Sequence, residues 1–159
     1  MIKYLLLIIF LFSINTFSAE KKKFDPKLKS EVLLVLEENE KLHASFFKYN
    51  GSKVEKNTKS VITIINKVTH PELKKLFAFS KARLKSITSK RNREDNNKSY
   101  HIFSMALIYI MKTYELGDDY QGFWCPMVRK QWVQNIKKQA KVHNPYAPSM
   151  PNCGEHTKV

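Results

Sequence analysis

The stretch LKSEVLLVLEENEKLHASFFKY, residues 28–49, decides the fold class because it carries a clear helical pattern. Its apolar side chains recur every three or four residues, and only Asn39 interrupts the stripe. This spacing predicts an amphipathic helix with one buried face. Asn50-Gly51-Ser52 then predicts the end of the helix, because Gly51 can adopt the left-handed conformation of a C-cap. The stripe consists of Leu28, Val32, Val35, Leu42, Phe46 and Tyr49.

Further apolar stripes at the same spacing predict three more helices. One lies within residues 54–68, and Thr69-His70-Pro71-Glu72 after it has the pattern of a capping box with proline in the first turn. The next lies within residues 73–87. Residues 88–98 have no apolar side chain and predict a solvated connection, and the last helix runs from about Ser99 to Glu115. Short links between helices of similar length favour an antiparallel four-helix bundle over residues 20–117.

The composition changes after Gly117. Residues 118–159 hold both cysteines, both tryptophans and four of the six prolines. Within them Val128, Trp132 and Ile136 are spaced four apart, which predicts a short fifth helix with Trp132 facing the bundle. Prolines 145, 148 and 151 argue against regular structure beyond it. We therefore predict an all-α chain whose irregular C-terminal tail packs on the bundle and forms one domain with it.

The N-terminal segment has the pattern of a signal peptide. Lys3 precedes a short apolar run, and small or polar residues follow through Ala19. The run is shorter than the ~20 apolar residues that span a bilayer, although an uncleaved anchor is the alternative interpretation. We expect the signal peptide, residues 1–19, to be removed so that the mature chain begins at Glu20, or at Ala19 if cleavage falls one residue earlier. We also expect the protein to be periplasmic or secreted.

The chain is strongly basic, with 28 Lys and Arg against 14 Asp and Glu and a net charge of +14. Residues 126–142 contain Arg129, Lys130, Lys137, Lys138 and Lys141 and no acid. In a cytosolic protein such a run would suggest nucleic acid. Export makes an acidic partner protein or weak contact with an anionic membrane surface the expected functional interpretation, and a merely solvated face is the structural one. We expect no nucleic acid.

Soft metal ligands cluster in the tail. Cys125-Pro126-Met127 places a thiol and a thioether close together, and Met150 and Cys153 form another close pair. Thiolate and thioether sulfurs select Cu(I), so copper(I) is the candidate cofactor. His143 and His156 flank these residues as supplementary ligands. A Cys125–Cys153 disulfide and two unrelated thiols are the alternatives that the residues leave open.

The order of motifs in the tail resembles a bacterial exported domain of unknown function. The matching residues are Phe123-Trp124-Cys125-Pro126-Met127, Trp132, Asn144-Pro145-Tyr146 and Met150-x-x-Cys153-Gly154. That domain occurs alone and also appended to periplasmic adaptor subunits of copper/silver efflux pumps, with a helical region before the motif. The resemblance implies the binding of copper-like ions through Cys125, Met127, Met150 and Cys153. It also implies a metal-efflux or metal-handling partner in the envelope. Trp132, Asn144, Pro145 and Tyr146 would anchor the tail.

The remaining candidate residues predict no catalysis. His70 lies in a predicted helix-capping turn, and His43 and His101 lie within predicted helices, where structural roles are the default. Cys125 with a nearby histidine has the chemistry of a nucleophile and base, but no third orienting residue accompanies them. Glycine-rich phosphate loops and zinc-protease patterns are absent from the sequence. The sequence therefore predicts an exported, non-catalytic protein that binds or responds to a soft metal such as copper or silver. The alternative is a disulfide-closed helical structural or interaction module whose basic surface meets an acidic partner or an anionic membrane.

Overall fold

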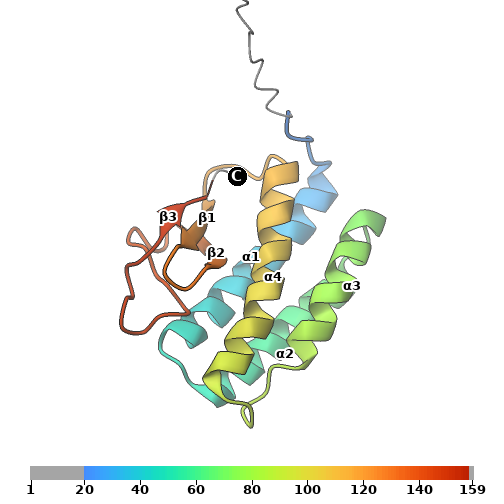
Figure 1. The fold of residues 1–159 in the computed structure, drawn as a ribbon. Coiled ribbons are helices and arrows are strands. Elements are labelled where there is room, and N and C mark those ends of the chain that lie inside the picture. Colours follow the sequence, from blue (N-terminus) through green and yellow to red (C-terminus); the bar gives the residue numbers. More distant parts are fainter. Residues whose placement is uncertain (1–19, 158–159) are drawn as a thin grey trace, which may run out of the picture.

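The computed structural model describes residues 20–157 and shows four helices followed by a small antiparallel sheet (Figure 1). The predicted signal peptide, residues 1–19, lies outside the described residues. The helices are α1 (Pro26–Phe47), α2 (Gly51–Lys67), α3 (Pro71–Lys85) and α4 (Arg93–Thr113). The strands are β1 (Tyr120–Cys125), β2 (Lys130–Asn135) and β3 (Glu155–His156), in the spatial order β2-β1-β3. The prediction of an all-α fold is therefore wrong, and the chain has a mixed α/β fold.

The starts of α1 and α2 are set by polar side chains that cap the first turn. Asp25 accepts a hydrogen bond from the Leu28 N–H (2.9 Å) at the start of α1, and Pro26 occupies its first turn. Asn50 caps α2 in the same way through the Lys53 N–H (2.9 Å). Gly51 is therefore the first residue of α2 and not the left-handed C-cap that the sequence predicts for the preceding helix.

Helix α4 begins six residues before the predicted Ser99. Asn92 caps it through the Asp95 N–H (2.8 Å), and Glu94 and Asp95 lie in its first turn, where the helix dipole favours negative charge. Polar residues thus form the first turns of α4, before its apolar stripe begins.

The predicted capping box before α3 is also wrong. Thr69 turns to α1, where its hydroxyl donates to one Glu31 carboxylate oxygen (2.6 Å) and its N–H donates to the other (3.0 Å). His70 is the N-cap residue and makes no side-chain capping bond. Glu72 accepts a hydrogen bond from the Tyr114 hydroxyl instead of reaching back to the cap. Tertiary partners have replaced both halves of the local motif.

The predicted fifth helix is a β-hairpin. Strand β1 pairs with β2 from Tyr120 opposite Asn135 to Cys125 opposite Lys130. The chain reverses between them, with Arg129 in the left-handed region (φ 52°) and its N–H donating to the Cys125 carbonyl (2.9 Å). Of the three residues spaced four apart, only Trp132 lies in a strand, because Val128 lies in the hairpin turn and Ile136 lies beyond the end of β2. Aromatic and β-branched residues favour the strand.

The helices and the sheet share one hydrophobic core. Consecutive helices pack on each other, and β2 packs on α4 and α1. Phe123, Trp132 and Tyr146 from the C-terminal part belong to the same buried cluster as Leu36 and Phe103 from the helices. In Figure 1 the sheet lies on the α1 and α4 side, away from α2 and α3. In residues 20–157, no helix combines the length and apolar character needed to cross a membrane.

Candidate functional site

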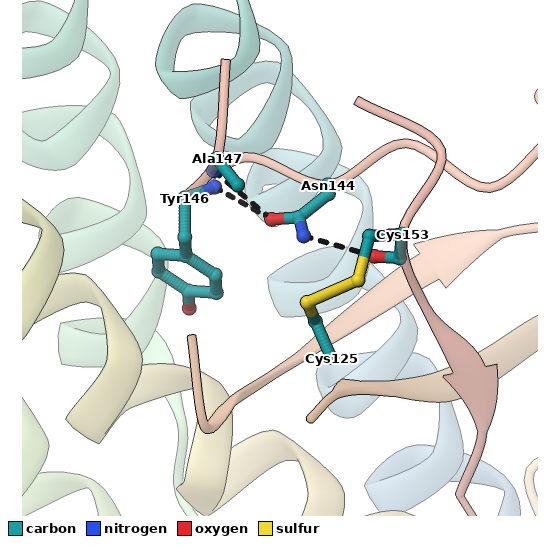
Figure 2. Close-up of a disulfide and its surroundings, with 5 residues drawn as sticks. All are labelled: Cys125, Asn144, Tyr146, Ala147 and Cys153. Carbon is teal, nitrogen blue, oxygen red and sulfur yellow. Dashed lines mark hydrogen bonds between the residues drawn. A yellow bond between two sulfur atoms is a disulfide. The ribbon is translucent and has the colours of Figure 1, made fainter. Parts of the chain in front are cut away.

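The two cysteines form a disulfide between the end of β1 and the C-terminal segment (Figure 2). Cys125 is fully buried and Cys153 is partly buried, and their Cα atoms lie 5.7 Å apart. Cys153 is held in a turn in which its N–H donates to the Met150 carbonyl (3.0 Å). Of the three interpretations that the sequence leaves open, this geometry corresponds to the disulfide.

Asn144 organises the segment around the disulfide. Its side-chain oxygen accepts hydrogen bonds from the N–H groups of Tyr146 (2.9 Å) and Ala147 (3.2 Å), and its amide nitrogen donates to the Cys153 carbonyl (2.9 Å), as Figure 2 shows. Asn144 is fully buried, and its backbone N–H donates to the Pro151 carbonyl (2.7 Å). One amide side chain thus fixes both the Asn-Pro-Tyr turn and the backbone beside the disulfide.

The other predicted anchors are buried as well. The Tyr146 hydroxyl lies between the Ser104 hydroxyl (3.2 Å) and the Gln131 carbonyl (3.0 Å), and burial raises the pKa of this phenol far above its ordinary value. The Pro145 carbonyl accepts a hydrogen bond from the Arg93 guanidinium (3.2 Å). Trp132 is fully buried, lies on the Phe123 ring with centroids 5.7 Å apart, and donates from its indole N–H to Gln134 (3.4 Å).

The position of Gly154, directly after Cys153, leaves no space for a side chain. A Cβ atom at this position would lie 2.6 Å from the Trp132 ring and 2.9 Å from the Val142 side chain. Any side chain at this residue would therefore displace the indole or the backbone beside the disulfide.

The outer edge of β2 is covered by side chains from the helices. On α1, Asn39 donates to the Val133 carbonyl (3.5 Å), and Glu40 accepts from the Asn135 N–H (2.8 Å). On α4, the His101 ring accepts from the Gln131 N–H (3.3 Å). Asn39, which interrupts the apolar stripe of residues 28–49, is thus a buried hydrogen-bond partner of β2. Its side-chain oxygen also accepts a hydrogen bond from the Tyr100 hydroxyl (3.2 Å).

Glu40 is a buried acid that the sequence analysis did not single out. Burial raises the pKa of its carboxyl to about 7, against the opposing effects of the Asn135 hydrogen bond and of Lys138. Only its polar character on an otherwise apolar helix face signals its role, and its partner strand was itself not predicted.

The predicted soft ligands do not all come together. The disulfide joins Cys125 and Cys153, but Met127 is 71% exposed in the hairpin turn and Met150 lies partly buried in the turn before Cys153. His156 lies on Phe123, with ring centroids 4.8 Å apart, and His143 packs against Phe47 and His43. Within residues 20–157 no group of three or more His, Cys, Asp or Glu side chains is placed to hold a metal ion. Because metal ligation needs deprotonated thiols, only the reduced pair fits copper(I).

His43 and His143 form a pair that the sequence analysis did not predict. Their ring centroids lie 5.5 Å apart, although the residues come from α1 and from the segment after β2. Burial, reinforced by the His143 ring, lowers the pKa of His43 to about 3. Burial and the Lys48 charge lower the pKa of His143.

The positive charge is concentrated on α2, α3 and the connection to α4. Residues 51–92 contain eleven Lys and Arg and only two acids, Glu55 and Glu72. Glu55 pairs with Lys59 (2.7 Å), and Glu72 accepts from Tyr114. We call this region the basic surface. Its basic residues are Lys53, Lys56, Lys59, Lys67, Lys74, Lys75, Lys81, Arg83, Lys85, Lys90 and Arg91.

The basic run that the sequence analysis singled out, residues 126–142, is partly neutralised. Lys137 pairs with Asp119, and Lys138 lies 4.0 Å from Glu37. The signal for the basic surface in the sequence is the excess of Lys and Arg over acids in residues 51–92, and not the longest segment without an acid.

Apolar features accompany the basic surface. Phe79 on α3 is 62% exposed, and the Arg83 guanidinium lies 5.6 Å from the centre of its ring. A groove of about 220 Å³ lies between α2 and α3, and its lining includes Ile65, Lys74 and Lys81. Helix α3 therefore exposes apolar as well as basic side chains.

The disulfide and the comparisons with other proteins bear on the compartment and the relatives of the chain. A disulfide is consistent with an oxidising compartment. The resemblance of the tail motif to an exported domain stays a prediction. Comparison of the chain with family models, with curated proteins and with solved structures finds no match.

Proposed function

We propose that the protein is a periplasmic or secreted, non-catalytic interaction module, closed by the Cys125–Cys153 disulfide, that binds an acidic protein through the basic surface. The single observation that carries this proposal is the segregation of charge. Eleven of the Lys and Arg residues lie in residues 51–92, and both acids of that region are already engaged by Lys59 and Tyr114. Like charges on neighbouring helices attract an acidic partner and accelerate its association.

The apolar features favour a protein as the partner. Interfaces between proteins are centred on aromatic and arginine side chains, and the exposed Phe79 lies beside Arg83 in the middle of α3. The groove beside Lys74 and Lys81 has room for a small apolar side chain between two charges. An anionic membrane surface would be attracted by the charge alone and would not require the groove.

The disulfide has a supporting role in this proposal. It holds the C-terminal segment on β1, on the side of α1 and α4, and so leaves α2 and α3 uncovered (Figure 1).

Charge reversal at matched positions tests the proposal. The variant Lys74→Glu/Lys75→Glu/Arg83→Glu changes three exposed residues of the basic surface. The control Arg129→Glu/Lys130→Glu/Lys141→Glu makes the same change in net charge around the hairpin. Binding to polyglutamate is measured by calorimetry at several salt concentrations, together with binding to vesicles containing phosphatidylglycerol.

We expect the first variant to bind polyglutamate at least tenfold more weakly than the control does. An equal loss of polyglutamate affinity in both variants would mean that only net charge matters. That result would contradict binding through the basic surface. Binding of the wild type to the vesicles but not to polyglutamate would replace the protein partner with a membrane.

Copper(I) handling by the reduced protein is the second candidate function, in association with a metal-efflux or metal-handling protein of the envelope. It is favoured by the proximity of Cys125 and Cys153 and by the exposure of Met127 two residues after Cys125. Reduction would free two thiolates, and Met127 or Met150 would supply a thioether. We expect reduced wild type to compete with a Cu(I) chelator and Cys125→Ser/Cys153→Ser to compete poorly. Equal affinity of the two proteins would remove this candidate.

A further inference from the structure

Apolar side chains are exposed on both α3 and α4, which pack on each other (Figure 1). Phe79 on α3 is 62% exposed, and Met105 and Tyr109 on α4 are 51% and 58% exposed. A groove of about 340 Å³ lies between the two helices, and Leu76 and Tyr109 line it from its two sides. We call Leu76, Phe79, Met105 and Tyr109 the apolar strip.

The helical repeat places Phe79 on the side of α3 that faces α4. Phe77 lies in the core, and Lys74 lines the groove on the α2 side of the helix. Leu76 and Phe79 are three residues apart, so they share the side that borders α4. The two exposed apolar residues of α4 are four apart and share a side of their helix by the same rule.

Positive charge lies at both ends of the apolar strip. At one end the Arg83 guanidinium lies over the aromatic ring that α3 exposes. At the other end Lys22 and Lys75 line the groove. Glu72 is the acid among the lining residues, and its carboxylate already accepts a hydrogen bond from Tyr114. The groove therefore combines an apolar floor with a rim that attracts negative charge.

We infer that the apolar strip binds an amphipathic helix of the acidic partner. The apolar side chains of that helix enter the groove between α3 and α4, and its carboxylates meet Arg83, Lys22 and Lys75. This inference rests on the proposed function, because it identifies the element of the acidic protein that makes the contact.

A helix fits this surface better than an extended segment does. An extended peptide gains most of its affinity from the unpaired backbone of a sheet edge, whereas α3 and α4 present side chains. An amphipathic helix binds a groove through apolar side chains that repeat every three or four residues, and the apolar strip has the same repeat on each of its helices. A second copy of this chain is disfavoured as the occupant, because each copy carries a net charge of +14.

The test uses two synthetic peptides of the same composition, rich in glutamate and leucine and about 18 residues long so that a helix can form. In the patterned peptide the leucines repeat every three or four residues on one face. In the scrambled peptide they are distributed around the helix. Binding of each peptide and of polyglutamate to the mature chain, with its disulfide intact, is measured by calorimetry.

Tyr109→Ser and Leu34→Ser are the matched variants. Tyr109 lies on α4 and outside the basic surface, so the proposed function alone predicts no effect of its replacement. Leu34 on α1 is 52% exposed and lines a different groove, beside Asp119 and Lys138. Both side chains are exposed, so both variants are expected to fold.

We expect wild type and Leu34→Ser to bind the patterned peptide at least tenfold more tightly than the scrambled one, and Tyr109→Ser to lose most of this preference. All three proteins should bind polyglutamate equally, because polyglutamate requires only charge. If polyglutamate binds, equal affinity of wild type for the two peptides, or an unchanged preference in Tyr109→Ser, would overturn this inference and leave the proposed function intact. Absence of polyglutamate binding to wild type would overturn both.

Two further measurements address other occupants of the apolar strip. Analytical ultracentrifugation of wild type alone should show a monomer, and a dimer that Tyr109→Ser abolishes would assign the strip to a second copy. Vesicles containing phosphatidylglycerol should bind wild type and Tyr109→Ser equally. A loss of vesicle binding in Tyr109→Ser, without a preference of wild type between the two peptides, would assign the strip to a membrane and overturn the inference.

Discussion

Reduction of the Cys125–Cys153 disulfide should lower the free energy of unfolding by about 3.5 kcal/mol. The two cysteines are 28 positions apart, so the bond closes a loop of about that length. Closing such a loop removes about 12 cal/mol/K of chain entropy from the unfolded state, which corresponds to about 3.5 kcal/mol at 25 °C. Domains of this size have a net stability of roughly 5–15 kcal/mol. The loss is therefore a large part of the total.

The folded state should survive this reduction. Asn144 still holds the Cys153 carbonyl, and Tyr146 still bonds Ser104 and Gln131, so the C-terminal segment keeps its contacts. Reduced wild type is a better comparison than a serine variant, because serine would bury a hydroxyl at the fully buried position of Cys125.

Urea unfolding with and without reductant is the assay, followed by tryptophan fluorescence because Trp132 is fully buried. The Cys125→Ala/Cys153→Ala variant is the control, and its midpoint should not respond to reductant. The slope of the free energy with urea reports the surface exposed on unfolding and should be compared between the two states. A change below about 1 kcal/mol in wild type would refute the loop-closure argument.

Three further perturbations test the packing around the disulfide and α1. Trp132→Ala should cost about 3–5 kcal/mol, and an unchanged urea midpoint would show that the hairpin is not docked on the helices. Gly154→Ala should cost about 1–3 kcal/mol because its Cβ would lie 2.6 Å from the Trp132 ring, whereas Gly51→Ala, with its nearest contact at 3.4 Å, should be close to neutral in the same assay. The pKa of Glu40 is raised from 4.5 to about 7, so its contribution to stability is complete below pH 4.5 and is lost as the pH rises through 7. Between pH 5 and pH 8, wild type should lose up to about 3 kcal/mol relative to Glu40→Gln, and a difference independent of pH would contradict this assignment.

The helical half of the fold could be predicted because its signal is local. Each apolar stripe lies on a helix, since burial of one face gives a period that no loop reproduces. The early start of α4 could not be found from apolar residues, because Asn92 and the first-turn acids set it through hydrogen bonds and the helix dipole.

The sheet was missed because its evidence is ambiguous at short range. The helix-like spacing of Val128, Trp132 and Ile136 is accidental, because Val128 lies in the hairpin turn, Trp132 in β2 and Ile136 beyond its end. The strands are stabilised by contacts with residues far away in the chain, such as Asn39 and Glu40 on α1. Predicting the hairpin would have required recognition of the chain reversal between Cys125 and Lys130.

The part of the candidate site that depends on the two cysteines could be predicted from the sequence. The proximity of Cys125 and Cys153 is confirmed, because a disulfide was among the interpretations of a chain with two cysteines. The pairing of His143 with His43 was out of reach, since it depends on how α1 packs on the C-terminal segment. Ligand roles for Met127, Met150 and His156 stay predictions.

The covering of β2 by helix side chains has a consequence for how the protein behaves at high concentration. An unpaired strand edge recruits strands from other molecules and so seeds aggregates. On β2 the outward backbone groups of Gln131, Val133 and Asn135 are taken by His101, Tyr146, Asn39 and Glu40. These four side chains occupy the N–H and carbonyl of Gln131, the Val133 carbonyl and the Asn135 N–H, so a foreign strand can form few backbone hydrogen bonds with this edge. The β2 edge of the sheet is thereby protected from strand exchange without closure of the sheet into a barrel.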